Sequence, residues 1–290
     1  MSLPALSLII LAALIHASWN LLAKRASAAG PAFVFAYSCI IGLVYLPLAT
    51  LQWQRHDAGW PPALLVCIVL SGVLHVAYNL CLQRGYQVAD LSVVYPIARG
   101  TGPLLSTLAA FILLGEQPTP AGIAGLVAII TGIVLISTQG RLAKFREPAA
   151  RRGVRWGLIT GASIACYTVV DAYGVKVLGM EPLLFFWLSN VVHVLAMLPW
   201  VMPQAPRALR AMQGHWRLAI GVGVLSPLSY ILVLQALKLG APLSLTAPTR
   251  EMSMMVGTLL GALILREAVG RWRLLGCLVM IMGVALLAQA

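Results

Sequence analysis

The sequence predicts an all-α integral membrane protein whose ten transmembrane helices form two inverted five-helix repeats. Three observations lead to this fold class: the composition, a series of apolar segments of membrane-spanning length, and ordered matches between the two halves of the chain. Of the 290 residues, 60% are hydrophobic and only 10% are charged, and the mean hydropathy is +0.91. A soluble domain of this size carries far more charge on its surface. The composition therefore places the chain in the membrane class.

Ten apolar segments follow one another along the chain, separated by short polar connections. A spanning helix needs about 20 predominantly apolar residues. The candidate spans are 3–22, 31–51, 62–82, 91–114, 121–137, 156–177, 182–201, 218–237, 243–265 and 274–288. They lack the apolar–polar alternation of β-barrel strands. No basic leader precedes the first segment, so we interpret it as a span and not as a cleavable signal peptide.

The basic residues orient these spans. When the connections are numbered by the helices they join, the odd ones hold fifteen of the twenty Lys and Arg residues and the even ones hold three. Because basic connections stay in the cytoplasm, both termini are predicted to be periplasmic in a multi-pass protein of the inner (plasma) membrane. The net charge of +12 is thus explained by topology. A nucleic-acid interface would need a folded basic domain, so we expect a lipid bilayer and no nucleic acid as partner.

The two halves of the chain resemble each other at an offset of 151 or 152 residues. Ordered matches at one offset indicate an internal repeat. The matched pairs are Asn20 with Asp171, Gln83 with Gln235, Ser92 with Ser244, Pro96 with Pro248, Glu116 with Glu267, Gly125 with Gly276 and Gly132 with Gly283. We predict a first repeat at 1–138, a basic cytoplasmic linker at 139–154 and a second repeat at 155–290. Five spans per repeat force the second copy to enter the membrane upside down, an arrangement typical of secondary transporters.

The chain resembles the EamA-type transporters of the drug/metabolite transporter superfamily over its whole length. The residues that carry the resemblance are HASWN at 16–20, the segment 89–116 and its echo at 241–267, which share the pattern A-x-x-S-x-x-x-P…E. The resemblance implies ten helices in two inverted units around a central cavity, without ATP. It also implies that the fifth and tenth helices lie outside that cavity, and amino-acid and metabolite exporters are the nearest members. The glycine pairs of these two helices suit close helix packing or merely accommodate local crowding.

Four formal charges lie well inside predicted spans: Arg99, Asp171, Arg250 and Glu251. Each costs about 2.5–3.5 kcal/mol at a helix centre, so each must face a wet cavity or a partner. The alternative is a salt bridge that only locks two helices together. Arg99 and Glu251 are equivalent in the two repeats and are expected either to meet or to bracket a zwitterion, with Arg99 on its carboxylate and Glu251 on its ammonium. Adjacent residues of a helix differ by about 100°, so Arg250 and Glu251 are expected to point in different directions.

Polar and aromatic residues at helical spacing extend this set. For a single aromatic residue, ordinary packing or an interfacial belt is the alternative interpretation. The predicted solute-binding residues are Asn20, His75, Tyr78, Asn79, Tyr95, Arg99, Tyr167, Asp171, Trp187, Tyr230, Ser244, Arg250 and Glu251. Glu116 and Glu267 close two spans and are expected to act in gating or packing. A coupling proton could be carried by His16, His75, His193 or Asp171, which leaves uniport, exchange and proton coupling as alternatives.

Motifs for chemistry are absent from the sequence. There is no GxxxxGK[ST] loop for ATP, and neither HExxH nor GxSxG occurs. The five cysteines lie in apolar segments without CxxC spacing and are interpreted as small buried hydrophobic residues. We therefore expect no metal and no cofactor, and a secondary transporter that exports small organic solutes, amino acids first, by alternating access. The alternatives are other metabolites or drug-like cations as solutes, an intramembrane enzyme, or a channel.

Overall fold

A computed structural model describes residues 2–55, 59–88, 91–140, 148–257 and 270–289. This part of the chain contains helices and no strands. The long helices are α1 (Leu3–Arg25), α2 (Gly30–Gln54), α3 (Pro62–Val88), α4 (Leu91–Leu113), α5 (Pro120–Thr138), α6 (Pro148–Ala172), α7 (Pro182–Val201), α9 (Trp216–Lys238) and α12 (Arg271–Gln289). The short ones are η1 (Ser27–Ala29), the π-helical η3 (Tyr173–Val177), η4 (Met202–Gln204), α8 (Ala205–Ala211) and α10 (Leu243–Arg250).

Local chemistry sets many of these helix ends. A proline occupies the first turn of α2, α5 and α7, where its missing N–H costs nothing. The Thr119 side chain accepts a hydrogen bond of 3.0 Å from the Gly122 N–H and so caps α5. A helix satisfies most of its backbone groups internally, which suits lipid because lipid offers no hydrogen-bond partners.

Nine of the described helices are long and apolar enough to cross a membrane. Large apolar side chains cover their outer surfaces, as lipid-facing residues do; Leu43 and Ile112 are 71% and 80% exposed. This agrees with a multi-pass membrane protein. One predicted span is interrupted: α10 ends at Arg250, Glu251 lies in a turn, residues 252–257 are helical again, and 258–265 lie outside the described residues. Glu267 and residues 141–147 of the predicted linker lie outside them too, whereas α6 starts at Pro148, before the predicted span.

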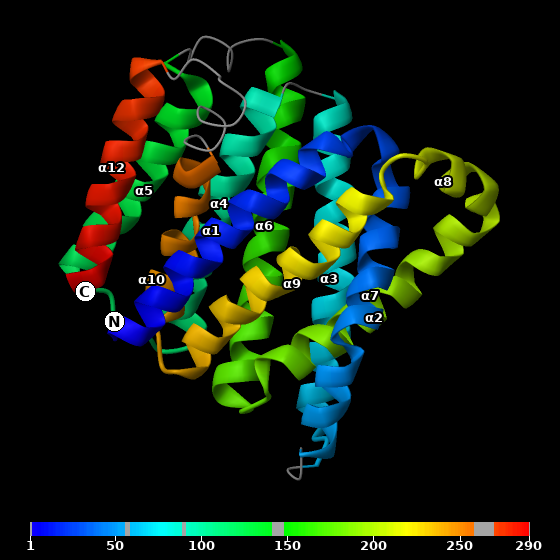
Figure 1. Cartoon of the computed structure of the whole chain (residues 1–290). Helices are drawn as coiled ribbons and strands as arrows, with labels where there is room; N and C mark the ends of the chain where they lie inside the picture. Colours follow the sequence, from blue (N-terminus) through cyan, green and yellow to red (C-terminus); the bar gives the residue numbers. More distant parts are fainter. Residues whose placement is uncertain (1, 56–58, 89–90, 141–147, 258–269, 290) are drawn as a thin grey trace.

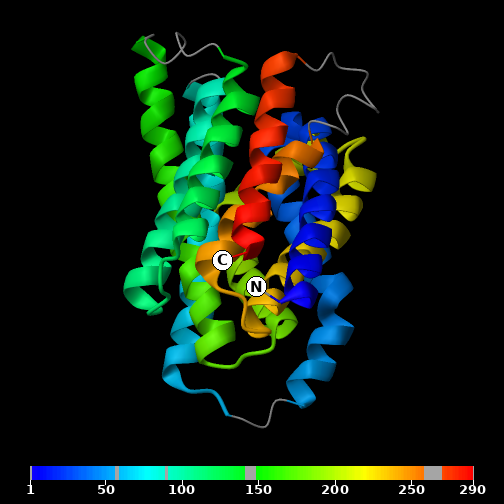
Figure 2. The same ribbon diagram turned by 90° about the vertical axis from the view of Figure 1, so that its left-hand side faces the viewer.

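The helices run up and down, so that successive connections alternate between the two ends of the bundle (Figure 1). The two termini lie side by side at one end, and the view turned by 90° shows the same neighbourhood (Figure 2). The odd-numbered connections lie together at the opposite end (Figure 1). Exposed basic residues accompany these connections: Arg25, Arg84, Arg151, Arg152, Arg155, Arg207, Arg210, Arg217 and Arg271.

The packing of the helices pairs elements from the two halves of the chain. α3 packs against α6 and α7, whereas α9 packs against α1 and α2. The pairs α2 with α7, α4 with α10, and α5 with α12 join helices at the same place in each half. α6 is the most enclosed of the spanning helices, with 56% of its apolar window buried. Contacts among α3, α4, α6, α9 and α10 place these helices around a shared interior.

Glycines allow the closest of these contacts. A Cβ atom on Gly125 would lie 2.8 Å from the Gly283 carbonyl oxygen, and one on Gly132 would lie 2.7 Å from that of Gly276. The predicted close packing of these glycines is confirmed, and their partners are each other, across the α5–α12 contact. The buried interpretation of the cysteines was wrong in part, because Cys166 is exposed, while all five cysteines are free. A thiol is a small, weakly polar group and is tolerated at an exposed apolar position as well as in the core.

Candidate functional site

An ion pair joins α4 to the turn after α10. The Arg99 Nε atom lies 2.7 Å from Glu251 Oε2, and Arg99 Nη2 donates to Ser253 Oγ at 2.9 Å. The two side chains are 10% and 1% exposed. Of the two arrangements predicted from their equivalent places in the repeats, they adopt the direct meeting. The pair neutralises two charges that would each be costly alone inside the bundle.

The second arginine of the site, Arg250, approaches the same carboxylate. Its Nε atom lies 3.9 Å from Glu251 Oε1, and its guanidinium stands 5.8 Å from the centre of the Tyr230 ring. Arg250 and Glu251 were expected to point in different directions, and the ends of their long side chains still approach each other where α10 ends.

Asp171, at the end of α6, forms the acidic centre of a second cluster. The Tyr230 hydroxyl of α9 donates to Asp171 Oδ2 at 2.6 Å, and the residue is 1% exposed. Its other oxygen, Oδ1, has no hydrogen-bond partner among the described residues. His75 and Ser71 of α3 lie beside it. His75 Nδ1 lies 2.9 Å from the Ser71 carbonyl oxygen, which can only accept, so Nδ1 carries a proton.

Aromatic rings from α3, α6 and α9 surround this carboxylate. His75 stacks on Tyr167 with ring centres 4.1 Å apart. Tyr78 and Tyr230 meet Tyr167 edge to face at 5.7 and 6.1 Å. On the α4 side, the Arg99 guanidinium stands 5.8 Å from the Tyr95 ring. Rings and formal charges thus alternate through the interior of the bundle.

Several of these side chains keep accessible surface despite their depth. His75, Tyr78, Tyr95 and Tyr230 are half-buried, although each lies among several helices. A fully packed interior leaves no such surface. These residues therefore border space that a small molecule or water can reach.

Four of the predicted solute-binding residues form contacts outside this group of charged and aromatic side chains. Asn20 donates to the His16 carbonyl of its own helix, and the Trp187 indole donates to the Gly42 carbonyl of α2 at 2.9 Å. Asn79 lines a narrow apolar pocket with Pro31, Val34, Val76, Leu80 and Met197. Ser244 belongs to the network around Glu116. The pattern of apolar and polar residues in the sequence does not distinguish a polar side chain that hydrogen-bonds two helices together from one that faces a cavity.

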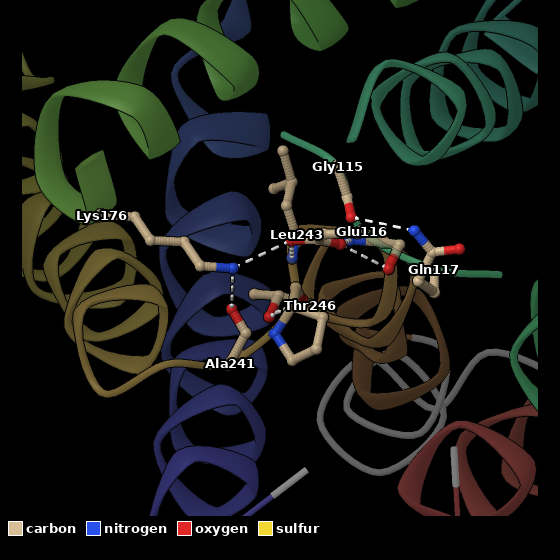
Figure 3. Close-up of polar contacts among 9 residues, drawn as sticks. Gly115, Glu116, Gln117, Lys176, Ala241, Leu243 and Thr246 are labelled. Atoms are coloured by element: carbon tan, nitrogen blue, oxygen red, sulfur yellow. Dashed lines mark hydrogen bonds and ion pairs between the residues drawn. The ribbon is translucent and has the colours of Figure 1, made fainter. Parts of the chain in front are cut away.

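Glu116, in the connection between α4 and α5, holds the start of α10. Its Oε1 accepts from the Leu243 N–H at 2.7 Å, and its Oε2 accepts from the Ser244 N–H at 2.9 Å and from Ser244 Oγ at 2.6 Å. Lys176 of η3 pairs with Oε1 at 3.0 Å and also donates to the Ala241 carbonyl (Figure 3). Burial alone would raise the pKa of Glu116, but these hydrogen bonds outweigh it and hold the pKa below its ordinary value.

Sequence reasoning did not assign roles to three of the residues that complete these networks. Lys176 was counted only as a charge in a connection, and Ser71 and Ser253 were passed over. Ser71 and Ser253 each lie within four residues of a predicted site residue, which was a usable indication. Lys176 is 60 residues from Glu116, and only the fold brings them together.

A cavity of about 170 Å³ opens beside the Glu116 network, and Thr107, Gln117, Thr119 and Ser244 are among its polar lining residues.

A metal centre is not indicated in the part of the chain that the structure describes, since no three His, Cys, Asp or Glu side chains gather there. The fold and the site together define a polytopic membrane protein with a charged, aromatic interior.

The chain belongs to the EamA-like transporter family, whose model matches residues 3–138 and again residues 151–289. This is a family of transporters and not of enzymes. Among curated relatives, the multidrug resistance protein EbrB of Bacillus subtilis (strain 168) is 26% identical over 119 residues, which are 38% of this chain and 97% of the relative. EbrB of Bacillus atrophaeus is 26% identical over 116 residues, which are 37% of this chain and 94% of the relative. A solved crystal structure, described only as that of a protein, has the same fold, with a TM-score of 0.73 at 16% identity over 98% of both chains.

Proposed function

We propose that this protein is a secondary transporter that exports small organic solutes, amino acids first, across the inner membrane by alternating access. The observation that carries the proposal is the interior of the bundle, where two arginines, two carboxylates and a set of tyrosines lie at membrane depth. Such groups are expensive in a membrane and are kept where a solute needs them. The family supplies the class of activity, and the mixture of both charge signs with aromatic rings suits a small amphipathic zwitterion.

Alternating access rests on two inverted five-helix units, which we infer from paired contacts. A Cβ atom on Gly72 would lie 2.7 Å from the Ser189 carbonyl of α7, and one on Gly223 would lie 3.2 Å from the Tyr37 carbonyl of α2. Gly72 and Gly223 are 151 residues apart, and Tyr37 and Ser189 are 152 apart, so each contact is the copy of the other. The reciprocal glycine contacts of α5 and α12 support the same two-fold relation.

Ten spans, with the interrupted segment from Leu243 as the ninth, complete these units and put both termini on one side. The gathering of exposed arginines at the end opposite the termini supports cytoplasmic odd connections and periplasmic termini. We infer that the solute space lies between Asp171, Arg250 and the tyrosines, with the Arg99–Glu251 pair in its wall.

The test is a counterflow panel of labelled amino acids, sugars and cationic dyes in proteoliposomes. We expect saturable exchange of amino acids that is independent of ATP. Product formation without counterflow would support an enzyme, and flux without saturation would support a channel.

A second solute class, drug-like cations, is favoured by a specific observation. A carboxylate bordered by aromatic rings, as around Asp171, also binds organic cations. The two matched relatives are multidrug resistance proteins, which agrees with this alternative. Dyes that exchange in the panel while amino acids do not would make it the better description.

A further inference from the structure

Two buried ionic groups in the interior are only partly satisfied by the described residues, since Arg250 has only a carboxylate at 3.9 Å and Asp171 has one hydrogen-bonded oxygen. The Asp171 Oδ1 atom accepts no hydrogen bond, and the Arg250 Nε atom donates none. Both residues are at most 5% exposed. Arg99 Nε and Glu251 Oε2 also lack a well-aligned hydrogen bond, but these two atoms lie 2.7 Å apart as an ion pair and Arg99 Nη2 donates to Ser253. Arg250 Nε lies 3.9 Å from the same carboxylate, which Arg99 already neutralises. An incompletely partnered buried charge is costly, so Asp171 and Arg250 are the groups with binding capacity to spare.

The same tyrosine stands between these two groups. Its hydroxyl is bonded to the Asp171 carboxylate, while its ring lies beside the Arg250 guanidinium at 5.8 Å. Asp171 and Arg250 form no ion pair with each other. Tyr230 therefore contacts both a negative and a positive group. The arrangement matches a ligand that carries opposite charges on neighbouring atoms and can reach both groups.

The surroundings of each group suit one end of such a ligand. Asp171 lies beside the stacked rings of His75 and Tyr167, and an ammonium gains from both a carboxylate and aromatic faces. Arg250 offers a planar set of N–H donors, which bind a carboxylate in two-pronged fashion.

We propose that Asp171 and Arg250 form a two-point site for a zwitterionic α-amino acid, with Asp171 on the ammonium and Arg250 on the carboxylate. The side chain of the solute then lies against the rings of Tyr78 and Tyr167. This inference rests on the proposed transport function and deepens it. It moves the solute contacts away from Arg99 and Glu251, which serve as a closed pair that fixes the turn after α10.

The test uses three probes that differ only in their charged ends: phenylalanine, phenethylamine, which lacks the carboxylate, and 3-phenylpropionate, which lacks the ammonium. Their apparent Kd values are measured on the purified full chain from ligand-induced shifts in thermal unfolding. Asp171→Asn is expected to raise the Kd of phenylalanine and phenethylamine by about tenfold or more and to leave 3-phenylpropionate unchanged. Arg250→Gln is expected to weaken phenylalanine and 3-phenylpropionate by a similar factor and to leave phenethylamine unchanged.

Conservative variants separate binding from folding. Arg250→Lys and Asp171→Glu keep the charges and are expected to recover part of the lost affinity. Lys238→Gln is the control, because Lys238 pairs with Glu181 at the far end of α9 and should leave all three Kd values unchanged.

Equal weakening of all three probes in both variants, or no weakening in either, would overturn the two-point site. If the wild type exchanges amino acids in liposomes but the two variants do not give this crossed pattern of Kd values, the two-point site alone is refuted. If the variants give the crossed pattern but the wild type moves no amino acid, the site is supported and the proposed transport of amino acids is overturned.

Discussion

Removal of the Glu116 carboxylate is expected to release the start of α10. The carboxylate accepts hydrogen bonds from two backbone N–H groups and one hydroxyl, and it pairs with Lys176. Hydrogen bonds to charged groups contribute about 1.5–3 kcal/mol each, and they are not additive within one network. The Lys176 side chain is 27% exposed, so solvent screens its share. Glu116→Ala should therefore lower the free energy of unfolding by about 3 kcal/mol.

Thermal unfolding of the purified protein measures this loss. For a chain of this size we expect Tm to fall by about 6 °C or more. Glu181→Ala is the matched control, since Glu181 also pairs with a lysine at the same end of the bundle but is 44% exposed. An exposed pair contributes about 0–1 kcal/mol, so its removal should hardly move Tm. If both variants lower Tm equally, Glu116 does not hold α10 as described.

The ionisation of Glu116 is expected to make the stability of the folded protein depend on pH. The pKa of Glu116 is lower in the folded protein than its ordinary value, so the stabilisation is complete above that ordinary value and is lost as pH falls through the folded pKa. The wild type should lose stability in this acidic range, and Glu116→Gln should remove this step from the curve of Tm against pH. A Gln variant with an unchanged acid limb would refute the assignment.

Three further substitutions test the interior by the same measurement. Gly132→Ala places a Cβ 2.7 Å from the Gly276 carbonyl and should cost about 1–3 kcal/mol; a neutral effect would show that α5 and α12 can separate. Arg99→Gln leaves Glu251 buried without its partner and should cost about 3–5 kcal/mol, and the added change Glu251→Gln should restore much of that loss. Additive losses in that double variant would contradict a direct pair. Tyr230→Phe removes the bond to Asp171 and should cost about 1.5–3 kcal/mol, whereas no change would mean that water replaces the hydroxyl.

The fold class and the presence of polar residues deep inside the bundle could be predicted from the sequence, because both depend on properties that are local in the chain. Apolar length defines a span, and a charge such as Asp171 inside a span is visible by position alone. Helical spacing also grouped Tyr167 with Asp171 correctly on the interior side of α6. The partner of Asp171 was not predictable, since Tyr230 comes from another helix and their contact depends on how α6 and α9 pack.

Two contacts of the site could not be predicted from helical spacing. α10 ends at Arg250, two residues after Pro248, and the Arg250 Nε atom lies 3.9 Å from the carboxylate of the adjacent Glu251. Trp187 was grouped with the predicted solute-binding residues by helical spacing, and its N–H donates to the Gly42 carbonyl of α2. Helical periodicity gives the direction of a side chain but not what its surroundings offer it.

The short helix α10 connects two features at different depths of the membrane. Its first residues are held by Glu116 near one rim, and its last residue carries the arginine of the interior. Eight helical residues span only about 12 Å, so the Glu116 hydrogen bonds and the Arg250 guanidinium belong to the two ends of one short helix. If a ligand bound at Arg250 changes the stability of the Glu116 hydrogen bonds, thermodynamic linkage requires that loss of those hydrogen bonds changes the affinity for the ligand by the same free energy.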